Sequence, residues 1–244
     1  LRLRLDCNAS LYDFARNNCA TNIKKQERER DGELHELNGL DGLNGFNGKD
    51  LGQGELKELI LRQNRRSVGD IVSYISRSFY EDQLTCKTEV NRPQLEAEHR
   101  ILPDMEMGLH FVQVPHDELF KDPLSRSSFS TVEAQRTLEL LQQIVASGYR
   151  GTIGVIAPFR RQIGELQMLV LRDPTLRALY QEGERLVIDT VHRFQGRDCD
   201  TIIYNLCLAA SGGSQFALDE NITNVALSRA RYYLFVVGDP LALQ

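Results

Sequence analysis

The stretch ERLVIDTVHRFQGRDCDTIIYNL (184–206) contains two short runs rich in β-branched and other apolar residues. Leu186–Asp189 and Thr201–Leu206 are apolar at consecutive positions, which is typical of a strand in a sheet covered on both faces. Similar runs elsewhere in the chain predict four further strands, at Leu59–Leu61, His110–Val114, Thr152–Ala157 and Tyr233–Val237.

Helical patterns separate these runs. They cover Val68–Phe79, Val132–Ala146, Arg161–Leu171, Thr175–Glu182 and Thr223–Arg231. Ser130 or Thr131 ahead of Glu133 provides an N-cap, and Gly148 stands where a helix C-terminus favours glycine. Strands that alternate with helices predict an α/β fold, with a mostly parallel sheet flanked by helices.

Composition and charge exclude several classes of protein. The 244 residues are 41% hydrophobic and 26% charged, as in ordinary globular domains, and their net charge is −5. Any contact with nucleic acid must therefore come from a local basic patch. No apolar run approaches the roughly 20 residues of a membrane span. The five cysteines include no CxxC pair, which excludes a zinc ribbon and favours a reducing cytoplasmic or nuclear setting.

The composition changes near residue 57. Residues 38–54, NGLDGLNGFNGKDLGQG, repeat an Asn-Gly or Asp-Gly step that favours tight turns, and they follow the mixed-charge run KKQERERDG (24–32). We therefore expect residues 1–57 to be a link and a Gly/Asn-rich flexible connector, and residues 58–244 to be the folded domain. The opening LRLRLDCNAS lacks an initial Met, so we expect a piece of a longer protein.

Polar residues follow several of the predicted strands. They are RQNRRS (62–67), PFRRQ (158–162) and TVHRFQGRD (190–198), and NVALSRAR (224–231) precedes the last strand. Ligands of parallel sheets bind at the carboxyl ends of the strands, so we expect these residues to gather at one edge. Arginine forks and a closely approaching glycine are what a polyphosphate site requires. The alternative is an α/β domain whose arginines only form surface ion pairs.

Four of these segments resemble motifs of superfamily 1 helicases. TVHRFQGRDCDTII (190–203) and NVALSRAR (224–231) look like motifs V and VI, and LRQNRRS (61–67) looks like motif IV. IGVIAPFRRQ (153–162) is similar to the segment between motifs IV and V. The resemblance runs from about Leu59 to Pro240, and it implies a RecA-like P-loop-type domain.

The spacing of these motifs points to one branch of the superfamily. The interval from Arg66 to Thr190 is too short for the large domain that Rep-type helicases insert there. SFSTVEAQ (128–135) also looks like the branch that contains the nonsense-mediated-decay and Sen-type helicases. That resemblance implies an ATP-dependent helicase or translocase that moves 5′ to 3′ on single-stranded DNA or RNA.

The chain contains neither GxxxxGK[ST] nor a hydrophobic strand that ends in Asp-Glu. The resemblance therefore implies the second RecA-like domain of such an enzyme, without a Walker A loop of its own. ATP and Mg²⁺ would be bound mainly by the first RecA-like domain of the same protein. We expect this chain alone to be inactive, and Gly238-Asp239-Pro240 to mark the end of its last strand.

The resemblance also implies roles for individual residues. Arg66 and Arg229 would approach the γ-phosphate as arginine fingers, with Gln195 and Gly196 at the cleft between the two domains. Asp198 stands where the family usually has a nucleotide-contacting Glu. The remaining site residues are Arg65, at the position of a base-stacking Tyr, and the nucleic-acid contacts Thr190, His192, Pro158 and Arg160. No metal ligands are expected among them.

Three departures from the family pattern leave a second function open. Arg65 replaces the motif IV Tyr, Ala157-Pro158-Phe159 replaces a Thr-Pro-Tyr segment, and Asn221-Ile222 replaces a pair of arginines. A helicase-like domain with these changes could be a catalytically degenerate module that binds nucleic acid or protein. A RecD-like motor within a nuclease complex is a third option, which partner subunits would distinguish.

Overall fold

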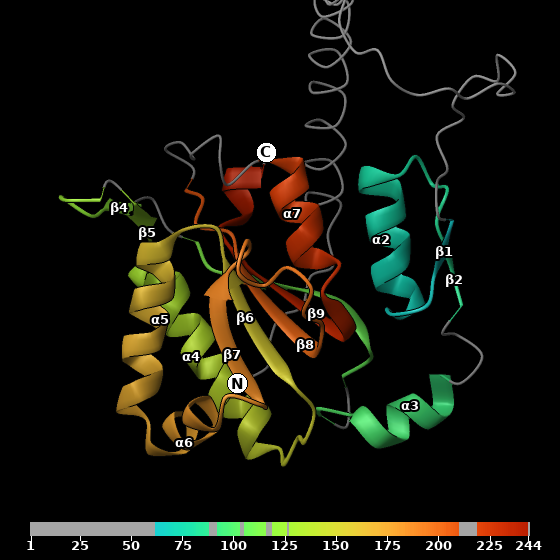
Figure 1. The fold of residues 1–244 in the computed structure, drawn as a ribbon, viewed down its shortest axis with the longest axis horizontal. Helices are drawn as coiled ribbons and strands as arrows, with labels where there is room; N and C mark the ends of the chain where they lie inside the picture. Colours follow the sequence, from blue (N-terminus) through green and yellow to red (C-terminus); the bar gives the residue numbers. More distant parts are fainter. Residues whose placement is uncertain are drawn as a thin grey trace, which may run out of the picture.

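A five-stranded, entirely parallel sheet lies at the centre of the chain (Figure 1). Its strands lie in the order β3 (Gly108–Gln113), β9 (Ala230–Gly238), β8 (Cys199–Asn205), β6 (Ile153–Ala157) and β7 (Leu186–Thr190). Strand order differs from chain order, and the crossovers place helices against the sheet. The prediction of an α/β fold with a mostly parallel sheet is confirmed.

The computed structural model describes residues 62–87, 92–102, 105–115, 119–125, 127–209 and 219–243. The link and connector expected over residues 1–57, and the strand expected at Leu59–Leu61, lie outside the described residues. The boundary between the two segments therefore stays a prediction.

The apolar runs explain which strands lie inside the sheet. Every residue of β6 and of β8 is buried, as expected for central strands covered by helices on both faces. The edge strand β7 alternates between buried and half-buried positions. Strands β3 and β9 place Phe111 and Phe235 in the same core.

Helices cover both sides of the sheet. On one side lie α4 (Thr131–Ala146), α5 (Arg160–Arg172) and α6 (Pro174–Glu182); α2 (Gly69–Phe79) and α7 (Glu220–Leu227) lie on the other (Figure 1). The Ser130 hydroxyl accepts a hydrogen bond from the backbone N–H of Glu133, which confirms the predicted N-cap of α4. Gly148 follows the end of α4 with a left-handed φ of +81°, as its position predicts.

The helix predicted over Thr223–Arg231 is wrong at both ends. Asp219 caps α7 through the backbone N–H groups of Asn221 and Ile222, so the helix begins earlier. At its other end, the Ser228 N–H bonds back to the Asn224 carbonyl, and the chain enters β9 at Ala230. Arg229 therefore lies in a turn and Arg231 in a strand.

Several short elements were not predicted. They are β1 (Gln63–Asn64) paired in parallel with β2 (Thr85–Cys86), helix α3 (Arg92–His99), the antiparallel hairpin of β4 (Phe120–Lys121) and β5 (Ser128–Phe129), and the 3-10 helix η3 (Pro240–Leu243). Strand β9 ends at Gly238, and the Asp239 carboxylate then accepts the N–H of Leu241 at the start of η3, as expected for the end of the last strand. No helix in the described part of the chain is long and apolar enough to cross a membrane.

Candidate functional site

The structure divides the predicted site residues between two opposite edges of the sheet. Thr190 is the last residue of β7 and Pro158 directly follows β6, so both lie at the carboxyl edge. Asp198 directly precedes β8 and Arg229 directly precedes β9, so both lie at the amino edge. The prediction of one shared edge is therefore wrong. The segment from residue 191 to 198 returns the chain from one edge to the other, because β7 and β8 are parallel.

Four charged side chains form what we call the amino-edge cluster: Arg66, Asp198, Arg229 and Arg231. The Arg231 Nε lies 2.6 Å from Asp198 Oδ2, and its Nη1 lies 3.4 Å from Asp200 Oδ1. The Arg66 Nε lies 3.8 Å from the same Asp198 oxygen. One carboxylate thus holds two guanidinium groups that come from opposite ends of the described chain.

Backbone contacts fix the motif IV segment against the start of β9. The Asn64 Oδ1 accepts the N–H groups of Arg66 and Ser67 at 2.9 and 3.0 Å. The Ser67 hydroxyl donates to the carbonyl of Ala230 at 2.6 Å, and the Val68 N–H donates to the carbonyl of Arg231 at 2.9 Å. Position 66 is therefore anchored independently of its own side chain.

Arg66 and Arg229 are each held by a backbone carbonyl at the amino edge. Arg66 Nη1 donates to the Ser228 carbonyl at 3.0 Å, and Arg229 Nε donates to the Val225 carbonyl at 2.9 Å. The pKa of Arg229 is lowered, first by burial and then by the positive charge of Arg66. Two like charges held together are stabilised by an anion between them, so this pair fits a phosphate group.

Gln195 and Gly196 lie in the exposed turn that connects the two edges. Phe194 anchors this turn: its ring is fully buried, and a methyl group at Gly154 would lie 2.5 Å from it. Gly196 has a left-handed φ of +83° with open space on its Cβ side, so its backbone can be approached by a ligand. Arg65 is exposed, and its Nη2 contacts Gln63 Oε1 at 3.4 Å.

A pocket of about 210 Å³ lies at the carboxyl edge, and we call it the carboxyl-edge pocket. It is lined by Arg160, Ile163, Gly164, Gln167, Asp189, Thr190 and Arg193. Two of the predicted nucleic-acid contacts, Thr190 and Arg160, thus lie together. His192 is exposed in the following turn, whereas Pro158 is buried and does not line the pocket.

Arg193 is a lining residue that the sequence reasoning missed. Its Nη1 lies 3.9 Å from Asp189 Oδ2, and 74% of its side chain is exposed. It stands in the motif V segment, directly beside His192, but the resemblance assigns it no role. Its position three residues after the end of β7 could have identified it, because ligands of parallel sheets bind at the carboxyl ends of the strands.

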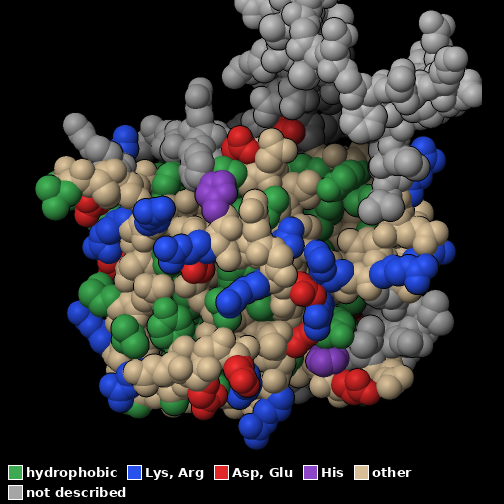
Figure 2. Space-filling view, viewed as in Figure 1, with side chains coloured by type: hydrophobic (Ala, Val, Ile, Leu, Met, Phe, Trp, Pro, Cys, Tyr) green, Lys and Arg blue, Asp and Glu red, His purple; other side chains and the backbone are tan. Residues whose placement is uncertain are grey.

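The basic side chains form two groups on the face shown in Figure 2. One group of Lys and Arg side chains lies over α5, and a second lies between the sheet and α2.

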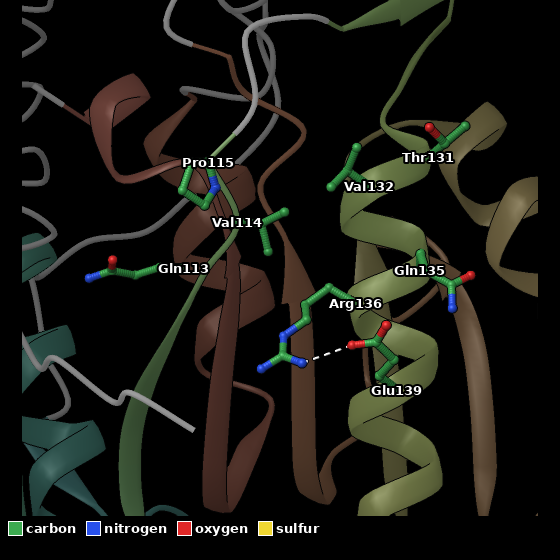
Figure 3. A pocket seen from close by; sticks show the side chains of 8 residues that line it. All are labelled: Gln113, Val114, Pro115, Thr131, Val132, Gln135, Arg136 and Glu139. Carbon is green, nitrogen blue, oxygen red and sulfur yellow. Dashed lines mark hydrogen bonds and ion pairs between the residues drawn. The ribbon is translucent and has the colours of Figure 1, made fainter. Parts of the chain in front are cut away.

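A larger pocket, of about 570 Å³, contains none of the predicted residues. Gln113, Val114 and Pro115 at the end of β3 line it on one side and the first turns of α4 on the other, where Arg136 Nη1 lies 2.8 Å from Glu139 Oε2 (Figure 3). Within the described residues, no three His, Cys, Asp or Glu side chains are placed to hold a metal ion.

The parallel sheet, its flanking helices and the arginines at its amino edge define a RecA-like α/β domain. The AAA_12 family, described as an AAA domain, matches residues 49–241. The chain therefore belongs to this family, the C-terminal part of superfamily 1 helicases of the Upf1, Mov10 and Sen1 type, and the resemblance drawn from the motifs is confirmed.

Three relatives illustrate this likeness. The chain is 30% identical to the regulator of nonsense transcripts 1 homolog of Arabidopsis thaliana over an alignment of 195 residues. This alignment covers 77% of the chain and 15% of the relative. It is 29% identical over 175 residues to helicase sen1 of Schizosaccharomyces pombe, an alignment that covers 70% of the chain and 10% of the relative. It is 31% identical over 140 residues to the protein named MOV-10 in Gallus gallus, which corresponds to 50% of the chain and 14% of the relative. The chain spans a fifth or less of the length of these relatives.

Proposed function

We propose that this chain is the second motor domain of an ATP-dependent helicase or translocase. In this proposal Arg66 and Arg229 act on ATP that is held, with Mg²⁺, by a first RecA-like domain of the same protein. The observation that carries the proposal is the pair of neighbouring guanidinium groups at the amino edge, held by Asp198 and by backbone carbonyls. ATP supplies the phosphoryl group that is transferred to water.

The arginines contribute by stabilising charge. Negative charge spreads over the γ-phosphate oxygens as the bond to the leaving group breaks, and fixed guanidinium groups lower the energy of that state. Arg229 is half-buried and bonded to the Val225 carbonyl, so little reorganisation is needed when a phosphate arrives. Until the phosphate arrives, the Asp198 carboxylate balances the positive charges of Arg66 and Arg231. Gln195 and Gly196 would complete the cleft between the two domains.

The carboxyl edge would bind the nucleic-acid strand. Arg160 and Arg193 offer two cations beside the buried Thr190, a combination suited to a sugar-phosphate backbone. The exposed His192 extends this surface. Contacts of this kind do not depend on the base sequence. The domain would move 5′ to 3′ on single-stranded DNA or RNA.

We also propose an intracellular location, either cytoplasmic or nuclear, because Cys199 and Cys207 are buried free thiols.

The test is ATP turnover by the full-length protein that carries this domain, with and without poly(dT) or poly(U). Strong stimulation that disappears in Arg229→Ala supports a nucleic-acid motor, and the better polymer distinguishes DNA from RNA. The isolated chain should not turn over ATP, and turnover by the pure chain would contradict the domain assignment.

A catalytically degenerate binding module is the second candidate function. Arg65 favours it, because this position offers an exposed guanidinium bonded to Gln63 instead of an aromatic ring for the adenine base. A folded full-length protein that binds single strands but shows no ATP turnover on either polymer would select this candidate.

A further inference from the structure

The β4–β5 hairpin is a projecting element that neither the fold nor the proposed ATP chemistry uses. Figure 1 shows it extending from the body of the domain near the N-terminal end of α5. Its two strands pair Phe120 with Phe129 and Lys121 with Ser128. The two phenylalanine rings lie on the same face, with their centroids 5.6 Å apart.

Arg161, in the first turn of α5, anchors this hairpin to the domain. Its guanidinium group lies 4.4 Å from the centre of the Phe129 ring and 3.7 Å from the Asp122 carboxylate. Glu165, one turn further along α5, holds the same guanidinium group at 2.9 Å. The Arg161 N–H also donates to the Ser127 hydroxyl at 3.2 Å. Because these contacts come from β5 and from both ends of the segment that connects it to β4, the hairpin is held against α5.

The turn of the hairpin is stiffened by Asp122. Its Oδ1 accepts the backbone N–H groups of Leu124 and Ser125 and the Ser125 hydroxyl, at 3.1, 2.7 and 2.8 Å. Phe120 nevertheless remains 47% exposed, and Leu124 at the turn is 96% exposed. A rigid element that keeps an aromatic ring in water has a surface ready for a ligand.

The hairpin is anchored at the start of α5, next to the carboxyl-edge pocket. Lys121, the residue after Phe120, is exposed, and the anchoring Arg161 adjoins Arg160, which lines that pocket. In the described part of the hairpin, Phe120 and Leu124 are the only large apolar side chains that are strongly exposed. Two separate side chains are a small area for a protein partner, whereas one exposed aromatic ring on an element anchored next to an arginine-lined pocket suits a base whose phosphates bind in that pocket.

We propose that the β4–β5 hairpin is a base-stacking step of the nucleic-acid path, with Phe120 contacting one base of a strand whose backbone enters the carboxyl-edge pocket. The ring stacks on any base, since every base has a flat π face, so this contact is independent of sequence. This inference rests on the proposed function. It adds a binding residue outside the helicase-like motifs.

The experiment uses the full-length protein and 12-nucleotide oligo(dT) and oligo(U) strands that carry one 2-aminopurine, moved along the strand position by position. Stacking on an aromatic ring changes the fluorescence of this base. Affinity is measured for the wild type and for Phe120→Ala, Phe120→Tyr, Leu124→Ala and Arg160→Ala, and circular dichroism and the thermal midpoint confirm the fold of each.

The expected result is one strand position whose 2-aminopurine signal depends on the Phe120 ring. Phe120→Ala should lose this signal and bind about five-fold or more weakly, whereas Phe120→Tyr should keep both and Leu124→Ala should match the wild type.

If Phe120→Ala binds like the wild type while Arg160→Ala binds more weakly, the hairpin proposal is overturned and the nucleic-acid surface stands. If the wild type does not bind either strand, both proposals are overturned. If Leu124→Ala also weakens binding as much as Phe120→Ala, the assignment to base stacking is overturned.

Discussion

The amino-edge cluster and the carboxyl-edge pocket are both rich in arginine, but they hold it differently. In the cluster, Asp198 contacts two guanidinium groups, and backbone carbonyls hold Arg66 and Arg229. In the pocket, Arg193 has one carboxylate contact at 3.9 Å and a side chain that is 74% exposed. The first region is therefore organised before a ligand arrives, as charge stabilisation in a reaction requires. The second is an open basic surface, which suits the sliding strand of the proposed function.

The largest effect that would test this comparison is on ATP turnover at the amino edge. Arg229→Ala in the full-length protein is expected to lower kcat by about 10³-fold or more, because an arginine finger contributes on that scale. Arg229→Lys should restore only part of the rate, since an ammonium group lacks the planar fork. Steady-state ATPase assays with saturating single strand measure both variants.

Arg172→Ala is the matched control for this loss. Arg172 is an exposed arginine in the last turn of α5, away from both regions, and its variant should turn over ATP like the wild type. An Arg229→Ala protein that is folded and retains its kcat would remove Arg229 from the reaction and with it the distinction between the two edges.

The next largest effect concerns the turn that connects the two regions. Phe194 is fully buried with its ring against Gly154, and it anchors the turn that carries Gln195 and Gly196. Phe194→Ala is expected to lower the free energy of unfolding by about 3–5 kcal/mol through the cavity that it leaves. Phe194→Leu keeps most of the apolar volume and should lose less. Urea unfolding followed by circular dichroism measures both, and an unchanged midpoint for Phe194→Ala would show that the turn packs elsewhere.

A smaller effect is expected at the open carboxyl edge. Arg160→Ala and Arg193→Ala should each weaken single-strand binding about equally on every sequence. Each should also reduce the slope of log affinity against log salt by about 0.7, the value for one lost phosphate contact. Fluorescence anisotropy titrations between low and moderate salt measure the slope. Slopes that match the wild type in both variants would mean that these cations do not meet phosphates.

The sequence predicted the sheet well because its strands are buried on both faces. Runs such as Thr152–Ala157 and Thr201–Leu206 have no periodicity to misread, and β6 and β8 match them within a residue or two. The capping residue of α4 was equally readable, because Ser130 stands three residues before Glu133. These signals are local, so a single chain carries them.

The placement of the site was less predictable because it depends on the path of the chain between strands. TVHRFQGRD (190–198) begins at the carboxyl edge and ends at the amino edge, so residues close in sequence serve different regions. The end of α7 was predicted wrongly for a related reason. Arg229 and Arg231 continue a helical pattern, but hydrogen bonds between β8 and β9, such as the Cys199 N–H to the Arg229 carbonyl, extend the strand instead.

The last prediction compares the two ends of β8 through their cysteines. Burial, reinforced by Asp200 and Asp198, raises the pKa of Cys199 at the amino end to about 11. Burial and then Glu133 raise the pKa of Cys207 at the carboxyl end. A raised pKa keeps the thiol protonated, so at pH 8 Cys199 carries about a hundred-fold less thiolate than an ordinary cysteine, and its reactivity should increase as the pH rises toward 11.

Iodoacetamide labelling of the native protein at pH 8, followed by peptide mass mapping, measures this difference. Cys86 is only half-buried and serves as the internal reference, and it should be labelled well before Cys199 and Cys207. After unfolding in urea all three should react alike, because the burial that protects them is lost. Rapid native labelling of Cys199 alone would mean that the start of β8 opens, and a cluster that opens in this way could not hold Asp198 and its arginines ready for a phosphate.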